Sequence, residues 1–191
     1  MESAGRITVR YPSSRYPSSS GSSSHQTVRT LAVVLRAQDD ILTLLEGQHR
    51  VIERLIDDVD NEDQPALKER LLEHLADAIT IHFALEERHL YLAFRDDRTD
   101  DVLADSRAAN AAMTAHLTFL LTHVGDPTFD ARFGLLREGF ERHIADDEHE
   151  LFPKVQTILP PERRRALGRV VRREGAELGR ARLLLRMSHS Q

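Results

Sequence analysis

The sequence contains no cysteine and no tryptophan among its 191 residues. Without cysteine, a disulfide scaffold, a thiolate metal site and a cysteine nucleophile are all excluded. Aromatic residues make up only 5% of the chain, and no apolar run approaches the roughly 20 residues that a membrane-spanning helix needs. We therefore expect no membrane interaction. The net charge of -5 provides no overall basic surface of the kind that nucleic-acid-binding domains carry.

Residues 1–27 form a segment of their own, rich in Ser, with the pentapeptide Arg-Tyr-Pro-Ser-Ser starting at both Arg10 and Arg15. The segment has too little apolar surface to offset the entropy of ordering, so we expect a disordered tail. It also lacks the apolar core of a secretory signal, and we expect a cytoplasmic protein.

From Asp39 onward, apolar residues recur with helical spacing. This pattern predicts four helices of roughly 20–28 residues, because turn or polar segments interrupt it at 61–65, 95–101 and 125–128. Pro153 is expected to kink or end the fourth helix. Short loops force neighbouring helices to be antiparallel, so residues 38–158 are predicted to form an all-α, up-down-up-down four-helix bundle.

A fifth helix is predicted over residues 161–187, and its composition differs from that of the bundle. Residues 162–186 hold nine Arg against three Glu, a local charge of +6. We interpret this helix as a basic cap that packs on the bundle, with binding of an anionic partner as the alternative. No aromatic residues alternate with the arginines, which argues against stacking on nucleic-acid bases.

The sequence has ten His, and one falls on the predicted inward stripe of each bundle helix: His49, His82, His116 and His143. Buried neutral imidazoles need polar partners, and a metal ion is the usual one. Two carboxylates strengthen this interpretation, because Glu86 follows His82 by four residues and Asp147 follows His143 by four. Side chains four apart differ by only about 40° around a helix, so each pair points the same way.

Four imidazoles and two carboxylates are too many ligands for one ion, but they suit two. On two six-coordinate ions, four His, two bridging carboxylates and a shared oxo or hydroxo group leave about two positions open for an exogenous ligand. Imidazole and carboxylate together suit iron, with manganese or zinc as competitors. The sequence therefore predicts a site for two metal ions, with iron as the favoured metal.

The two His-carboxylate segments have the same pattern: His82-Phe-Ala-Leu-Glu86-Glu-Arg-His-Leu-Tyr91 and His143-Ile-Ala-Asp-Asp147-Glu148-His-Glu-Leu-Phe-Pro153. They resemble the twin signature of hemerythrin-like (HHE cation-binding) domains. Leu45-Glu-Gly-Gln-His49 and His116-Leu-Thr-Phe-Leu are similar to the single-His segments of the family's first and third helices.

The sequence departs from this pattern at two places. Oxygen-carrying hemerythrins hold two His four apart on the third helix, whereas Leu120 and Ala112 flank His116 here. One iron ligand is therefore missing, or His123 replaces it. Some family members carry the fourth-helix acid five residues after the His, which here is Glu148. We favour Asp147, because the use of Glu148 would need a π-type bulge.

The resemblance implies a diiron protein that binds O2, NO or peroxide, with no catalytic residues beyond the metal ligands. About two open positions favour handling of peroxide or NO, with a catalase-like activity as one outcome, over simple O2 transport. One alternative is an iron or oxygen sensor, or an interaction module, without turnover. Another is a ferritin-like diiron oxidase, for which Glu46-x-x-His49 and Glu86-x-x-His89 have the right spacing. The sequence does not determine the native metal or the oligomeric state.

Overall fold

The computed structural model describes residues 40–95 and 100–189, and all regular structure in these two ranges is helical. In chain order the elements are α2 (Ile41–Asp60), α3 (Pro65–Leu85), η1 (Glu86–Tyr91), α4 (Leu92–Phe94), α5 (Asp100–Thr122), α6 (Phe129–Asp146), η2 (Asp147–Leu151), α7 (Phe152–Ile158) and α8 (Pro161–His189). The tail predicted over residues 1–27 lies outside the described residues.

The first two helices begin where local chemistry favours a start. The Asp40 side chain accepts a hydrogen bond from the backbone N–H of Leu42 at 3.1 Å, which caps the free donors at the start of α2. Pro65 occupies the start of α3, where a missing N–H costs nothing and the fixed φ angle suits the helix.

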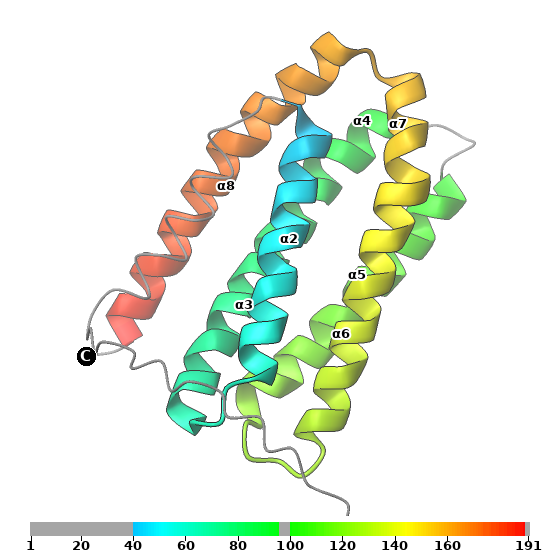
Figure 1. Ribbon diagram of the computed structural model, residues 1–191. Helices are drawn as coiled ribbons and strands as arrows, with labels where there is room; N and C mark the ends of the chain where they lie inside the picture. Colours follow the sequence, from blue (N-terminus) through cyan, green and yellow to red (C-terminus); the bar gives the residue numbers. More distant parts are fainter. Residues whose placement is uncertain (1–39, 96–99, 190–191) are drawn as a thin grey trace, which may run out of the picture.

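Four helical rods lie side by side and alternate in direction (Figure 1). The second rod runs through α3, η1 and α4, and the fourth runs through α6, η2 and α7 without a break. Helix α2 packs against α3, α3 against α5, and α5 against α6. The predicted all-α four-helix bundle is therefore confirmed. Pro153 lies just inside α7, so the fourth rod continues beyond it.

The apolar core consists of two clusters, one in each half of the bundle. One cluster includes Ile52, Leu75 and Phe140, and the other includes Leu45 and Phe152. The chain passes from one cluster to the other near His49, near His82 and after His143. The polar groups of the bundle interior therefore lie where the two apolar clusters meet.

Helix α5 is rotated relative to the prediction. Its buried residues are Leu103, Asn110, Met113, Leu117 and Leu120. Helical spacing in the sequence predicts an inward stripe of Ala109, Ala112 or Met113, His116, Leu120 and His123 or Val124. Met113 and Leu120 are buried as predicted, whereas Ala109, Ala112 and His123 are exposed. The predicted stripe was wrong for this part of the helix, and His116 is only half-buried as a result.

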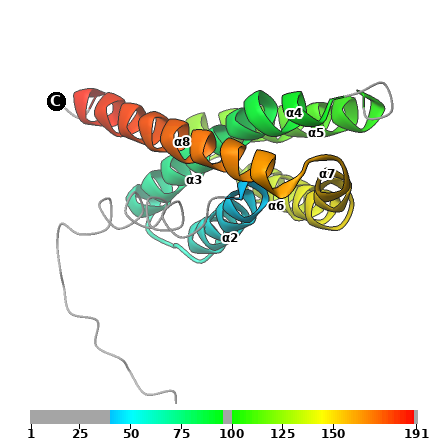
Figure 2. The same cartoon turned by 90° about the horizontal axis from the view of Figure 1, so that it is seen from above.

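The extra basic helix, α8, packs against α2, α3 and η1, and the view from above shows it lying along the α2–α3 side of the bundle (Figure 2). Arg164 donates to the Asp40 carboxylate at 2.9 Å, and Arg186 pairs with Asp77. The predicted packing of this helix on the bundle is confirmed. Within the described residues, no helix combines the length and the apolar character that a bilayer span requires.

Candidate metal centre

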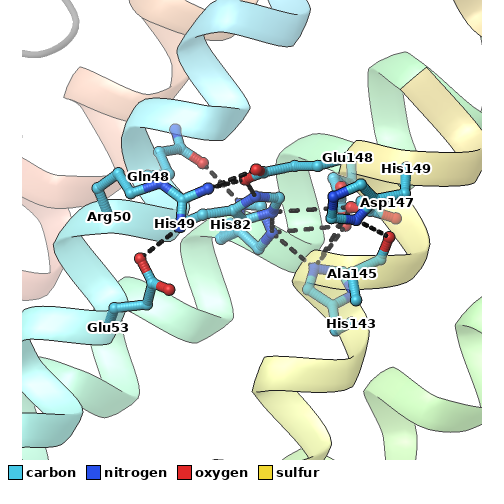
Figure 3. A network of polar contacts seen from close by, with 11 residues as sticks. Gln48, His49, Arg50, Glu53, His82, His143, Ala145, Asp147, Glu148 and His149 are labelled. Carbon is cyan, nitrogen blue, oxygen red and sulfur yellow. Dashed lines mark hydrogen bonds and ion pairs between the residues drawn. The ribbon is translucent and has the colours of Figure 1, made fainter. Parts of the chain in front are cut away.

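Five buried side chains, each from a different element, meet inside the bundle (Figure 3). They are His49 of α2, His82 of α3, Glu86 of η1, His143 of α6 and Asp147 of η2. Each offers one potential ligand atom, and these five atoms lie within 4.8 Å of one another. None of the five side chains is more than 5% exposed. We call these five residues the ligand group.

The three imidazoles turn the same ring nitrogen toward a common point. The Nε2 atom of His82 lies 3.2 Å from that of His49 and 3.0 Å from that of His143. The carboxylates complete the arrangement, with Glu86 Oε2 at 3.6 Å from His82 Nε2 and Asp147 Oδ2 at 3.5 Å from His143 Nε2. The donor atoms of the group therefore surround a small central space.

Two neighbours fix which nitrogen of each ring carries the proton. His49 Nδ1 lies 2.8 Å from the Glu148 carboxylate, and His82 Nδ1 lies 3.0 Å from the side-chain oxygen of Gln48. Both oxygens are acceptors, so both Nδ1 atoms carry hydrogen and both Nε2 atoms carry a lone pair. A backing of this kind, a carboxylate or amide oxygen behind an imidazole, orients metal-ligating histidines in many proteins.

Burial keeps the three imidazoles neutral. It lowers the pKa of His49 to about 3, with a smaller contribution from the nearby Arg50 guanidinium. It lowers the pKa of His143 to about 4 and that of His82 well below its ordinary value. At neutral pH none of the three rings carries a second proton, so the Nε2 atoms of His49 and His82 keep the lone pairs that their Nδ1 partners assign to them.

The two carboxyl groups of the site lack adequate partners within the protein. Glu86 Oε1 and Asp147 Oδ2 are buried without a hydrogen-bond partner, and the hydroxyl of Tyr91 donates a long hydrogen bond of 3.3 Å to Glu86 Oε2. Burial, followed by the proximity of Asp147, raises the pKa of Glu86 well above its ordinary value. Burial also raises the pKa of Asp147. A cation at the centre would satisfy both groups.

This donor set fits a metal ion. Bare Nε2 lone pairs of His49 and His82 face each other at 3.2 Å, an arrangement that repels unless a positive charge lies between them. Three imidazole nitrogens and two carboxylates, with no thiolate, suit iron, manganese or zinc. The structure thus supports a buried metal site at this place.

Each carboxylate of the ligand group begins a π-helical segment. Glu86 is the first residue of η1 and Asp147 the first of η2, and the Phe152 N–H donates to Asp147 O five residues earlier. The wider turn rephases the side chains that follow, so that the adjacent pairs Leu90-Tyr91 and Leu151-Phe152 are both buried beside the site.

Phenylalanine rings separate the ligand group from water. The ring of Phe152 stacks on His49 with centroids 5.9 Å apart, and that of Phe83 lies 5.2 Å from His143. Phe140 contacts the rings of all three ligand-group imidazoles. This apolar surround produces the low pKa values of the imidazoles, because it offers no solvent to a charged ring.

The structure brings together five of the six predicted ligands. The sixth, His116, lies on the wall of a neighbouring cavity between α5 and α6, with its Nδ1 atom buried and without a hydrogen-bond partner. Glu148, the alternative carboxylate ligand on the fourth helix, lies behind His49 and not within the ligand group. His123, which the sequence offered as a replacement for the missing third-helix ligand, is exposed and stacks on Phe119. Coordination of a metal ion, by the five residues of the ligand group or by His116, Glu148 or His123, stays a prediction.

Sequence reasoning missed two residues that contact the ligand group and one buried polar side chain in α5. Gln48 backs His82, Tyr91 contacts Glu86, and the side chain of Asn110 is buried in α5 with no hydrogen-bond partner. Asn110 is buried one turn before the buried Met113, and this helical spacing from an apolar residue was visible in the sequence. The sequence pattern did not indicate that Gln48 contacts His82, because the two residues lie on different helices.

A comparison with protein families adds independent information. Residues 40–155 match the family described as "Hemerythrin HHE cation binding domain", and this match covers more than half of the chain. Neither the curated proteins nor the solved structures gave a match. The matched range includes all five residues of the ligand group. The chain therefore belongs to the hemerythrin HHE cation-binding domain family.

Proposed function

We propose that this chain is a non-heme diiron protein that binds a small neutral ligand, O2, NO or peroxide. The observation that carries the proposal is the pair of bare Nε2 lone pairs on His49 and His82, held face to face by acceptors behind each ring. No hydrogen bond can join two lone pairs, so the arrangement stabilises only a bound cation.

Two ions are favoured over one because the two carboxylates can each bridge. Glu86 Oε2 faces the imidazoles, while Glu86 Oε1 is buried without a hydrogen-bond partner, which leaves Oε1 available to a second ion. His116, whose buried Nδ1 atom also lacks a partner, is the further imidazole that we assign to the second ion. An oxo or hydroxo bridge would complete the pair.

The bound iron would supply the redox chemistry, and the residues of the chain set the conditions for it. Tyr91 donates a hydrogen bond to Glu86 and holds that carboxylate on the side of the imidazoles. The rings of Phe83, Phe140 and Phe152 exclude bulk water. His143 and Asp147 form part of the cavity wall, so an exogenous ligand reaches the site from that side.

We further propose that the site handles peroxide or NO rather than transporting O2, because the side of the site that faces the cavity is open. The test is to load the metal-free protein with Fe2+ without oxygen and add peroxide while O2 evolution and the visible spectrum are recorded. We expect charge-transfer bands and faster turnover than by the same amount of free iron. If the loaded protein turns over peroxide no faster than free iron does, the proposed peroxide handling is wrong and ligand binding alone remains. Absence of the bands would contradict the diiron site itself.

A second candidate function, a metal sensor without turnover, is favoured by one contact. Glu174 of α8 accepts from His89 at 2.6 Å and from Arg88 at 2.7 Å, and both donors belong to the π segment that begins at Glu86. Metal binding at Glu86 could thereby change how α8 is held. This candidate predicts that iron protects residues 162–186 from limited proteolysis, whereas equal cleavage with and without iron would contradict it.

The ferritin-like alternative is less well supported. His89, which it needs as a ligand, instead pairs with Glu174. Glu46, its other required acid, lies outside the ligand group found among the described residues.

A further inference from the structure

A cavity of about 580 Å3 lies beside the ligand group, between α5 and α6. Its wall includes His143 and Asp147, two of the five residues of that group. The cavity is many times the roughly 30 Å3 that one water occupies in the liquid, so a hydrated ion can enter it. It therefore connects the surface of the bundle to the buried donor atoms.

Small residues keep this cavity open. Ala109 and Ala112 of α5 line it, and Gly139 lies opposite on α6. A Cβ atom at Gly139 would come within 3.0 Å of Met113 Cγ, so the two helices already approach closely there. A large side chain at one of these positions would fill the space that leads to the site.

The mouth of the cavity is acidic. Asp105 of α5, Glu138 and Asp146 of α6 and Glu150 of η2 are exposed lining residues, and Arg142 is the sole Arg or Lys that lines this cavity among the described residues. Lys154 lies 3.8 Å from Glu150, but both side chains are at least half exposed and water screens the pair. Four carboxylates against one guanidinium leave the mouth negative.

The inner end of the cavity carries a second feature that favours a cation. Asp147 is only 2% exposed, and its Oδ2 atom is buried without a hydrogen-bond partner. A buried carboxylate without a counter-charge is unfavourable in an apolar interior, and a cation arriving through the cavity would relieve it. Carboxylates thus line the cavity from its surface opening to the ligand group.

We propose that the α5–α6 cavity is the passage through which a divalent cation reaches the site, drawn in by Asp105, Glu138, Asp146 and Glu150. This inference rests on the proposed metal binding and adds its route. Clefts lined by one sign of charge raise the association rate of oppositely charged ligands by about 10–10³-fold, and salt weakens the effect. The acidic residues therefore act on how fast the metal arrives.

The passage is tested by stopped-flow binding of Co2+ to the metal-free full chain, followed by visible absorption. Ala112→Phe should slow association and dissociation by the same factor and leave the equilibrium constant unchanged, because an obstruction affects both directions equally. Ala111→Phe is the matched control, since Ala111 is an exposed neighbour on the same helix that does not line the cavity. Unchanged rates in Ala112→Phe, or equal slowing in the control, would overturn the proposal.

The acidic mouth is tested by charge. Neutralising Asp105, Glu138 and Glu150 together should slow association about tenfold at low ionic strength, with the difference disappearing in high salt. Arg142→Gln should speed association. The control neutralises Asp58, Asp63 and Glu69, which are exposed residues near the turn between α2 and α3.

The result for the wild type separates this inference from the proposed function. Tight Co2+ binding that is indifferent to all of these changes would overturn the passage alone. No binding of Co2+ or Fe2+ by the wild type would overturn both.

Discussion

Acidification should destabilise the metal-free protein, because its three buried imidazoles are neutral in the folded state. In the unfolded chain each takes up a proton near a pKa of 6.5, whereas in the folded protein the pKa is about 3 for His49 and about 4 for His143. The pKa of His82 is also lowered well below 6.5. Between pH 6 and 4.5 each of the three binds fewer protons when folded, and the stability that each contributes falls by about 1.4 kcal/mol per pH unit.

The two carboxyl groups of the site oppose this trend. The pKa of Glu86 is raised well above 4.5 and that of Asp147 is raised from 3.8, so the folded state holds one or two protons that the unfolded chain has released. Their contribution is present at low pH and is lost as pH rises. Three protons against one or two leaves a net difference of one to two. The free energy of unfolding should therefore fall by roughly 1.4–2.7 kcal/mol per pH unit on acidification.

Urea denaturation at several pH values, with metal removed by chelation, measures this slope. To isolate the site from surface charges, the wild type is compared with His143→Gln, which should reduce the slope by about 1.4 kcal/mol per pH unit. Equal slopes in the wild type and His143→Gln would refute the reasoning, because they would mean that His143 titrates alike in both states.

Three further predictions concern single residues. Gln48→Leu removes the acceptor behind a ligand-group imidazole and should weaken metal affinity about 10–100-fold without changing the number of ions bound, as measured by chelator competition; unchanged affinity would show that the backing is unimportant. Asp147→Asn should reduce the metal content per chain, whereas Glu148→Gln should only weaken affinity; the reverse result would make Glu148 the ligand. Phe140→Ala, at a fully buried site, should lower the free energy of unfolding of the metal-free protein by about 3–5 kcal/mol in urea denaturation; a loss below 1 kcal/mol would contradict its core role.

The sequence predicted the rods of the bundle well because its signals there are local and strong. Asp40 and Pro65 define helix starts by side-chain chemistry that acts within one turn. The pairing of His82 with Glu86 and of His143 with Asp147 follows from helical spacing alone, and the structure places each pair on one face. Of the two outcomes predicted at Pro153, a kink or an end of the helix, the end is wrong, because α7 continues beyond Pro153 after a π segment.

Helix α5 was harder to orient because alanine gives little information about which face is buried. Residues 108–116 contain five Ala, so two stripes that differ by one residue were almost equally apolar. The structure buries Asn110 and Leu117 rather than Ala109 and His116. The roles of Gln48 and Glu148 were also beyond reach, because contacts between different rods depend on their relative rotation and height.

The most direct test of the central claim is the iron content of the chain after anaerobic loading with Fe2+ and gel filtration. The ligand group should retain two ions per chain in the wild type and in His123→Ala, whose side chain lies outside the group. His82→Ala removes the imidazole whose Nε2 atom contacts both of the others and should lose bound iron. A wild type that emerges without iron, or a His82→Ala variant that retains as much as the wild type, would contradict the account.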